Sequence, residues 1–376
     1  MLKRLYVHNY KCLVNFEINF DQDISLFLGA NGSGKTSILI ILRELQKLIL
    51  RKDELGIEVF KSNTLTRWTF GKDNIQKIEL DIDGNDGSYK YVLEIEHQTE
   101  RGLVRLKKEN LYFNDEPLFT FQIEQENGMI VGNGRLFNDM KTNPDGIFYP
   151  VAWSSSGIGT VQERYDNKKL TWFKKWLERI FIAHINPSSI KIEINTEEMI
   201  RPQHPKWDVS NYAAWLFNSN RQGFAAVENS IREIISGFSF FDFPSSGEKK
   251  ILEVKINKCD YKFNELSDGQ KSLIVLYTLI YCTPENSLIC IDEPENFLAL
   301  PEIQPWLNAL RDQCSERNLQ VILISHHPSL INFLTANSGY WFSREDNHTR
   351  IQRITKQNEG GLSFAQLIEL GWIYEG

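Results

Sequence analysis

Hydrophobic and polar residues alternate along the first part of the chain. Period-two alternation over Leu2–Phe20 is typical of half-buried strands and predicts two strands around a turn. The inward face consists of Leu5, Val7, Leu13, Phe16, Ile18 and Phe20. The apolar run Ile24–Leu28 predicts a short buried strand, and the leucines and isoleucines of Ser37–Leu50 predict a helix buried over most of its surface.

A second alternating region follows a polar stretch. Ile75–Ile82 and Tyr89–Glu96 alternate, and the segment between them, DGNDG, is a strong hairpin signal. Leu103–Leu106 and Leu111–Phe113 continue the pattern, which predicts an antiparallel meander over residues 75–121. The glycines, asparagines and aspartates of Asn127–Gly146 predict loops.

Helical periodicity replaces alternation in the middle of the chain. Apolar residues at helical spacing predict a helix over Lys169–Ile182 and a helical block over Ser210–Ser236. In the second block Ser210 is a candidate N-cap and Gly223 a candidate break. These helices are too short, and have too few heptads, to form a long coiled coil.

The last third predicts helices between buried strands. Ile251–Ile256 alternates, Leu273–Tyr281 reads as a helix, and Ser287–Ile291 and Gln320–Ile324 read as buried strands. Ile351–Ile354 and a short capped helix from Ser363 complete the chain. The fold class is therefore α/β.

Composition restricts the class of protein. The chain has 376 residues, 41% of them hydrophobic, and a formal charge of −7, which gives no broad affinity for nucleic acid or anionic membranes. Its five cysteines have no C-x-x-C spacing, which suits a reducing cytoplasm and argues against a zinc site. No segment reaches about 18 apolar residues, so we expect a cytoplasmic protein without a membrane span.

The segment GANGSGKT, Gly29–Thr36, has the spacing of a phosphate-binding loop and stands between a strand and a helix. Gly29, Gly32 and Gly34 allow backbone N–H groups to turn toward a phosphate, and the positive end of the following helix favours the anion. Lys35 reaches the β- and γ-phosphates, and the hydroxyl of Thr36 is placed to bind Mg²⁺.

Three further motifs follow in the last third. LSDGQ, Leu266–Gln270, starts a helix and offers a second anion-binding surface through Ser267 and Gly269. The strand that ends in Asp292-Glu293 places one carboxylate to hold Mg²⁺ through water and one to polarise the attacking water. The final strand ends in Ser325-His326-His327, whose adjacent histidines point apart, so a metal site there is not expected.

The order and spacing of these motifs resemble an ABC-type ATPase head. Within this superfamily the chain resembles the branch that contains RecF, the SMC proteins and the OLD nucleases. The resemblance rests on the opening LKRLYVHNYKCL, the meander followed by KENLYFNDEPL, and the segments IDEPENFLALPE and LISHHPSLI. This resemblance implies a single head over residues 1–376, with a mixed core sheet. It also implies N-terminal strands, phosphate loop and helix over 1–60, a β meander lobe over 75–121, a compact helical insertion over 160–245, and a lobe with the signature, Walker B and switch histidine over 250–376.

The resemblance also implies roles for individual residues. Lys35 and Thr36 would bind triphosphate and Mg²⁺, Asp292 would support the metal, Glu293 would be the general base, and His326 would sense the γ-phosphate. Ser267, Gly269 and Gln270 would contact nucleotide held by a second head, so ATP would lie between two protomers of a homodimer or larger homo-oligomer. The implied ATP contacts in the phosphate loop are Gly29, Asn31, Gly32, Ser33, Gly34, Lys35, Thr36 and Ser37.

The chain departs from its relatives in two ways. It has no long coiled coil, and about fifty residues follow His326, which leaves no room for the nuclease domain of the OLD proteins. The glutamine that links the γ-phosphate to the second lobe has two candidates, Gln122 and Gln162.

Two functions follow from these features. The first is an ATP-dependent switch in bacterial anti-phage defence that controls a separately encoded nuclease or toxin. The alternative is a RecF-like clamp on DNA in repair, with nucleic acid as partner. Its support is two basic clusters, one with tryptophans between its lysines, which could equally be solvated surfaces. Their members are Lys168, Lys169, Lys174, Lys175, Trp172 and Trp176, and Arg101, Arg105, Lys107 and Lys108.

Overall fold

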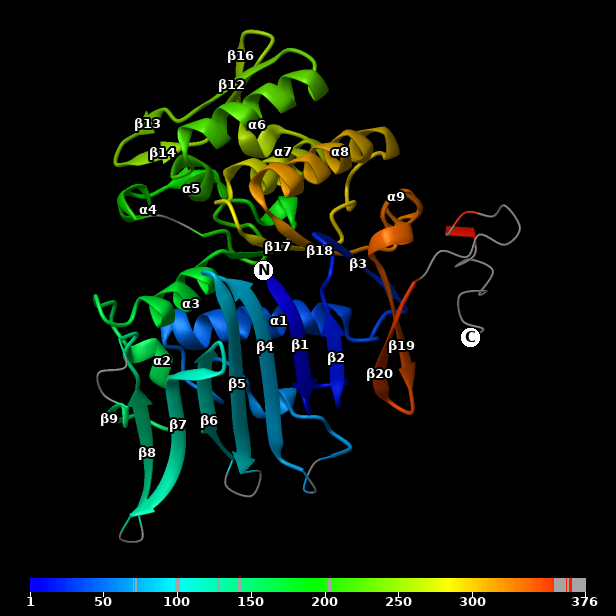
Figure 1. Cartoon of the computed structure of the whole chain (residues 1–376). Helices are drawn as coiled ribbons and strands as arrows, with labels where there is room; N and C mark the ends of the chain where they lie inside the picture. The colour runs from blue at the N-terminus through cyan, green and yellow to red at the C-terminus, as the bar shows by residue number, and fades with distance from the viewer. Residues whose placement is uncertain are drawn as a thin grey trace. The chain divides into compact units, whose positions relative to one another are not determined.

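The computed structural model describes residues 1–69, 71, 73–98, 102–126, 129–140, 144–201, 204–354, 363, 365 and 366. The chain forms two compact units (Figure 1). The first unit comprises Met1–Asp21, Gly29–Ile180 and Trp341–Gln352. The second comprises Gln22–Leu28, Phe181–Tyr340 and Arg353–Gly376.

The first unit is built on a sheet of eight strands in the order β2-β1-β4-β5-β6-β7-β8-β9, whose neighbours pair antiparallel. The strands are β1 (Leu2–His8), β2 (Phe16–Asn19), β4 (Ile75–Gly84), β5 (Gly87–Gln98), β6 (Leu103–Phe113), β7 (Glu116–Glu126), β8 (Met129–Leu136) and β9 (Ile147–Pro150). Leu5 of β1 pairs with Ile18 and Leu80, so the predicted inward face forms an apolar row across strands. The expected hairpin is confirmed, because Asn85 and Asp86 both have positive φ, as a two-residue type I′ turn requires.

Strand β8 corrects the prediction of loops over Asn127–Gly146. Gly132 and Gly134 lie inside this paired strand, at positions where their neighbours leave no room for a side chain. A Cβ on Gly132 would lie 2.4 Å from the carbonyl oxygen of Val151, and one on Gly134 would lie 2.9 Å from its side chain. Asn127, Gly128 and residues 141–143 lie outside the described residues.

The helices of the first unit follow the predicted apolar faces, and Figure 1 shows α1 running across the strands. They are α1 (Lys35–Gln46), a π-helical turn (Lys47–Arg51), α2 (Gly157–Thr160) and α3 (Lys168–Glu178). The 3-10 turn Ser62–Thr64 and the strands β19 (Gly339–Glu345) and β20 (His348–Arg353) complete the elements of this part of the chain. The predicted helix Lys169–Ile182 is too long, because Ile180–His184 forms strand β10, whose buried apolar run lies beside β17 of the second unit's sheet.

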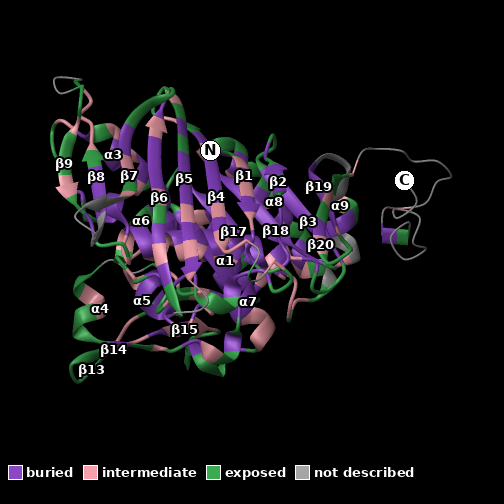
Figure 2. Cartoon of the chain, turned by 90° about the horizontal axis from the view of Figure 1, so that it is seen from below, coloured by how far each residue is buried: buried purple, intermediate pink, exposed green. Residues whose placement is uncertain are grey.

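The second unit contains the strands β10, β17 (Leu288–Asp292), β18 (Gln320–Ile324) and β3 (Ile24–Gly29), adjacent in that order. β17 pairs parallel with β18, and β18 pairs parallel with β3. Every residue of these last three strands is buried, as Figure 2 shows, which confirms the prediction of buried strands. The larger helices of this unit are α6 (Arg221–Ile234), α7 (Asp268–Cys282), α8 (Leu300–Arg317) and α9 (Pro328–Ser338).

The rest of the second unit combines short helices and strands. They are α4 (Thr196–Ile200), α5 (Tyr212–Phe217), the 3-10 turns Pro187–Ser189 and Phe263–Glu265, and β11 (Glu193–Ile194), β12 (Phe238–Asp242), β13 (Ser245–Ser246), β14 (Lys249–Ile251), β15 (Glu253–Ile256) and β16 (Cys259–Lys262). The helical block breaks between Phe217 and Arg221 and not at Gly223, because Asn220 caps α6 through the N–H of Gly223. Ser210 is not a cap, since α5 begins after Asn211. Of the helix expected from Ser363, most residues lie outside the described ones.

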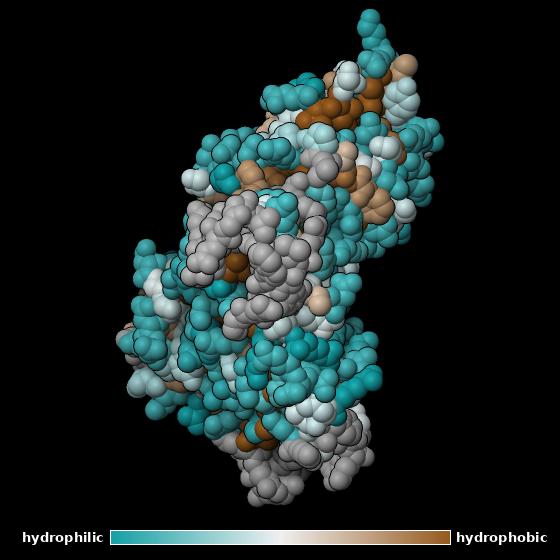
Figure 3. Space-filling model, turned by 90° about the vertical axis from the view of Figure 1, so that its right-hand side faces the viewer, coloured by the Kyte–Doolittle hydropathy of each residue, from teal (hydrophilic) through white to brown (hydrophobic). Residues whose placement is uncertain are grey.

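Polar side chains dominate one face of the molecule. Figure 3 shows one face on which most described side chains are hydrophilic and hydrophobic ones gather in a few patches. No helix in the described parts of the chain is long and apolar enough to cross a membrane.

Candidate functional site

The phosphate loop connects β3 directly to α1. Gly34, the residue before the helix, has a φ of 103°, a left-handed value that favours glycine. Lys35 is 6% exposed, and its Nζ donates to the carbonyl oxygens of Gly29, at 2.6 Å, and Ala30, at 2.9 Å. The ammonium is therefore held inside the curve of the loop, at the positive end of the helix, where an anion is favoured.

The remaining loop residues differ in exposure. Asn31 and Gly32 are exposed, Ser33 and Ser37 are buried, and Thr36 is half-buried. Asn31 and Gly32 therefore lie at the surface of the loop, and Ser33 and Ser37 lie beneath it.

A residue that the motifs did not indicate supports the loop from the same unit. The hydroxyl of Thr349, on β20, donates to the carbonyl oxygen of Ser33 at 2.8 Å, and its N–H donates to the carbonyl oxygen of Cys12 at 3.0 Å. A Cβ on Gly34 would lie 2.8 Å from that hydroxyl and 3.0 Å from the sulfur of Cys12. No sequence signal marks Thr349, because only the tertiary fold brings β20 to the loop.

The two acidic residues predicted for the site, Asp292 and Glu293, belong to the second unit. Asp292 is buried at the end of β17, and in the register of the sheet it lies opposite Ile324 of β18. Glu293 follows with a φ of 53°, unusual for a residue with a long side chain, and is held there by its N–H, which donates to the carbonyl oxygen of Ile324 at 2.8 Å. Its carboxylate accepts a hydrogen bond from Nδ2 of Asn296 at 2.8 Å. Backbone strain of this kind recurs at functional sites.

Glu295 connects the turn after β17 to Ser325 and His326, the residues that follow β18. Its Oε1 accepts from the hydroxyl of Ser325 at 2.7 Å and from the N–H of His326 at 3.2 Å. The backbone of His326 is therefore positioned by a carboxylate two residues after Glu293. The motifs assigned no role to Glu295, although it stands inside the segment DEPEN.

The signature residues begin α7 in the same unit. Ser267 is the N-cap: its hydroxyl accepts from the N–H of Gln270 at 3.2 Å, and Oε1 of Gln270 accepts from the N–H of Ser267 at 3.1 Å. This capping box fixes the start of the helix. Gly269 lies against the backbone of Phe297, since a Cβ there would be 2.7 Å from that carbonyl oxygen. All three signature residues thus have a structural role in addition to the implied nucleotide contact.

The structure places the predicted residues in two sets. Residues 29–37 belong to the first unit, apart from the strand that leads into them, and Ser267, Gly269, Gln270, Asp292, Glu293 and His326 belong to the second. Gln122 lies on β7 opposite Lys108, and Gln162 is exposed, so neither is distinguished as the linking glutamine.

The lysine and tryptophan cluster of α3 is largely engaged within the first unit. Lys174 donates to the carbonyl oxygens of Gly159 and Val161, and burial lowers its pKa. Trp172 stacks on Tyr89 with ring centroids 4.8 Å apart, and Trp176 is 4% exposed. Of the second cluster, Arg105 pairs with Glu96, and Arg101 lies outside the described residues. The tryptophans therefore stabilise the core and are not presented to bases.

The proposed magnesium ligands fit the metal chemically. Thr36 and Asp292 offer a hydroxyl and a carboxylate, the oxygen donors that Mg²⁺ takes in nucleotide sites together with phosphate oxygens. Among the described residues there is no group of three or more His, Cys, Asp or Glu side chains that could hold a metal alone.

Comparison with known proteins identifies the family of the chain. The family described as "AAA domain, putative AbiEii toxin, Type IV TA system" matches residues 24–332. An uncharacterised protein of Dictyostelium discoideum is 22% identical over 319 residues, which are 77% of this chain and 40% of that protein. A probable iron chelatin transport ATP-binding protein of Helicobacter pylori is 33% identical over 73 residues, 19% of this chain and 28% of its own length. The chain thus spans less than half the length of these relatives.

Two solved structures are similar to the chain, and the one with a TM-score above 0.5 shows the fold. An SMC head bound to the C-terminal winged-helix domain of ScpA has a TM-score of 0.54 at 13% identity, over 95% of this chain and 98% of its own. The SMC head domain from Thermotoga maritima has a TM-score of 0.47 at 15% identity, over 94% and 99% of the two chains.

Proposed function

The chain belongs to the family described as AAA domain, putative AbiEii toxin, Type IV TA system, and has the ABC-type ATPase head fold of the SMC and RecF branch; from this we propose that it binds ATP and hydrolyses it to ADP and phosphate. The observation that carries the proposal is the buried ammonium of Lys35, held inside a Gly-rich loop at the start of a helix.

The proposed mechanism assigns one task to each group. The loop N–H groups and Lys35 bind the phosphates, and Mg²⁺ held by Thr36 and Asp292 would neutralise charge on them. Glu293 accepts a proton from the water that attacks the γ-phosphate, and His326 contacts the γ-phosphate and stabilises the charge that develops there. The hydrogen bond from Nδ2 of Asn296 holds the carboxylate of Glu293, and the bond from the N–H of His326 to Glu295 positions the backbone of His326.

We further propose a molecular switch. Two copies close around ATP, with Ser267, Gly269 and Gln270 of one copy against nucleotide held by the other, and hydrolysis lets them open. A separately encoded nuclease or toxin would read the difference, and bacterial anti-phage defence is the proposed setting. The family description refers to a toxin and a toxin–antitoxin system, and this supports the toxin in the proposal.

Turnover measurements test the enzymatic proposal. We expect Mg²⁺-dependent release of phosphate from ATP by the wild type. Lys35→Ala should lose ATP binding, and Glu293→Gln should bind ATP normally but hydrolyse it about 100-fold more slowly, the lower range for loss of a general base.

The matched control is Lys61→Ala, which removes an exposed lysine of the same unit and should turn over ATP at the wild-type rate. Phosphate release that survives in Lys35→Ala would show that the activity comes from elsewhere.

A DNA clamp is the alternative, and the engaged lysines and tryptophans of α3 weigh against it. Experiments with Glu293→Gln protein in the presence of ATP distinguish the clamp from the switch. Salt-dependent retention of duplex DNA on filters would support the clamp. A stoichiometric protein that co-purifies from the native host would support the switch.

A further inference from the structure

A cavity of about 250 Å³ lies in the first unit, between the turn of the β6–β7 hairpin, the segment after β8 and the start of α3. Pockets for drug-sized ligands measure about 300–1,000 Å³, so this cavity has room for a smaller molecule. Its walls are apolar and consist of Phe113, Pro117, Leu118, Phe137 and Pro144.

Two half-buried charged residues, Asp139 and Lys169, also line the cavity. Their backbones are fixed, because the N–H of Asp139 donates to the carbonyl oxygen of Asp166 at 2.8 Å and the carbonyl oxygen of Lys169 accepts from the hydroxyl of Tyr89 at 3.1 Å. The N–H of Lys169 donates to Oδ2 of Asp139 at 3.3 Å. The two residues are therefore held beside each other at the cavity.

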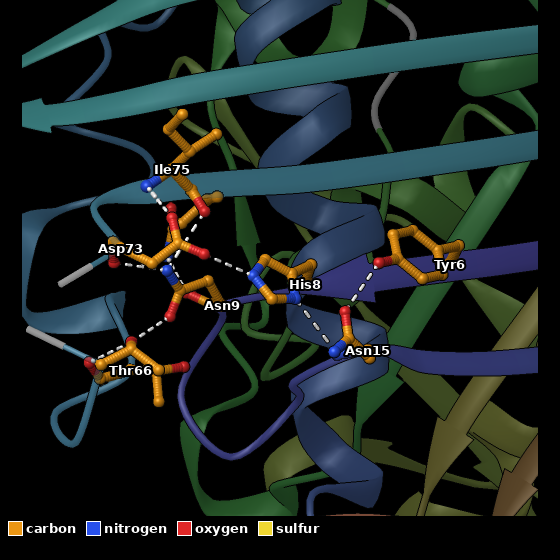
Figure 4. Close-up of polar contacts among 9 residues, drawn as sticks. Tyr6, His8, Asn9, Asn15, Thr66, Asp73 and Ile75 are labelled. Atoms are coloured by element: carbon orange, nitrogen blue, oxygen red, sulfur yellow. Dashed lines mark hydrogen bonds and ion pairs between the residues drawn. The ribbon is translucent and has the colours of Figure 1, made fainter.

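The carboxylate of Asp139 has unused hydrogen-bonding capacity. Within the described residues the N–H of Lys169 is its one donor, and Oδ1 is buried without any. Asp73 of the same unit differs, since its Oδ2 lies 2.8 Å from Nε2 of His8 and its Oδ1 accepts from the N–H of Ile75 at 3.1 Å (Figure 4). A carboxylate oxygen can accept two hydrogen bonds, so Oδ2 of Asp139 can take a donor from a ligand as well.

The ammonium of Lys169 also lacks an ionic partner among the residues that the structure describes. It lies over the ring of Phe113, 4.5 Å from the centroid, and forms no salt bridge with Asp139. Glu116 and Asn138, the other polar residues of the lining, are engaged by other groups. The apolar cavity thus has one carboxylate and one ammonium that do not neutralise each other.

We propose that this cavity binds a free α-amino acid with a large apolar side chain. The side chain occupies the apolar walls, the ligand ammonium pairs with Asp139, and the ligand carboxylate pairs with Lys169. Charge-assisted hydrogen bonds are the stronger kind, and burial of the side chain adds hydrophobic free energy. An amine alone leaves Lys169 unpaired and an acid alone leaves Asp139 unpaired, so the zwitterion is the ligand that satisfies both. No residue of the phosphate loop takes part, so this inference is separate from the proposed ATP hydrolysis.

Titration of the full chain, followed by NMR of the ligand, tests the ligand class. We expect L-phenylalanine to bind about tenfold more tightly than 2-phenylethylamine, which lacks the carboxylate, or 3-phenylpropionate, which lacks the ammonium. Glycine, which has both charges but no side chain, should not bind, because the apolar walls then contribute nothing.

Two variants test the pairing of charges. Asp139→Asn keeps an acceptor for the N–H of Lys169, and it should raise the Kd for L-phenylalanine and for 2-phenylethylamine about tenfold but not that for 3-phenylpropionate. Lys169→Met should instead weaken L-phenylalanine and 3-phenylpropionate and leave 2-phenylethylamine unchanged. Lys168→Ala is the matched control, because it removes the preceding lysine, which is exposed and does not line the cavity, and should change no Kd.

Three results would overturn the proposal. The first is a wild type that does not bind L-phenylalanine, and the second is variants that melt at the wild-type temperature and weaken all three ligands equally. The third is binding of N-acetylphenylalanine amide as tightly as L-phenylalanine, because the cavity would then take an apolar residue of a polypeptide. None of these results bears on ATP turnover, which is measured without the amino acid.

Discussion

At the scale of single residues, the site depends on buried or half-buried polar groups with defined partners. Lys35, Glu295 and Thr349 are each held by hydrogen bonds of normal length to backbone or side-chain atoms. His97, on β5, is a buried polar group of the same kind in the first unit. It is 1% exposed, and its Nε2 lies 2.9 Å from Oε1 of Gln76, while Nε2 of Gln76 donates to the carbonyl oxygen of Asn9.

His97 predicts a loss of stability in mild acid. Burial lowers the pKa of this imidazole to about 4, whereas in the unfolded chain it is about 6.5. Between these values the unfolded chain takes up a proton that the folded chain does not, so stability falls as pH falls from about 6.5 to about 4. At pH 5 the folded chain has lost about 2 kcal/mol of its free energy of unfolding through this group, relative to neutral pH.

His97→Gln measures this effect. The variant should be less stable than wild type at pH 7.5, and the difference in Tm between the two should narrow at pH 5. A difference in Tm that stays constant between these pH values would contradict the assignment, because the acid sensitivity would then arise from other groups.

At the scale of elements, close contact between backbones explains why a glycine stands within a helix better than a turn signal does. Gly223 lies in the first turn of α6, which packs on α7, and a Cβ there would be 2.5 Å from the carbonyl oxygen of Tyr281. The glycine reads as a break in the sequence, yet in the fold it is a contact point between two helices.

Gly223→Ala should therefore destabilise the second unit although alanine favours helices. Overpacking costs about 1–3 kcal/mol, and the gain in helix propensity returns about 1 kcal/mol. We expect Tm to fall by a few degrees in a thermal melt. The neighbouring exposed position serves as control, since Gln222→Ala keeps the helix and adds no contact; a Tm for Gly223→Ala at or above that of Gln222→Ala would refute the packing argument.

At the scale of the whole molecule, the phosphate loop is proposed to be half of a site. Ser267→Arg should abolish turnover while leaving ATP binding largely intact, because the bulky cation would block the neighbouring copy's nucleotide. In a Glu293→Gln background, light scattering on a sizing column should show an ATP-dependent dimer that Ser267→Arg removes.

Ser267→Ala is the control for folding, because it loses the same helix cap without adding bulk. The two variants should melt at similar temperatures, and only the arginine should abolish the dimer. Ser267→Arg protein that hydrolyses ATP at the normal rate would show that the composite site does not exist.

The sequence by itself determined the elements whose signals are local. Alternation predicted the strands around the DGNDG turn, the apolar runs predicted β3, β17 and β18, and the spacing of Gly29–Thr36 predicted the loop between β3 and α1, because side-chain periodicity and turn chemistry act over a few residues. The roles implied for Glu293, His326 and Ser267 remain predictions from resemblance.

Only the tertiary structure decided the features that depend on residues far apart in the chain. Strand β8 exists because β7 and Val151 accept its glycines, Ile180–His184 is a strand because β17 lies beside it, and Thr349 supports Ser33 across more than three hundred residues. No local pattern encodes such pairs, since hydrogen bonds and close contacts between distant segments form only when the fold brings their backbones together.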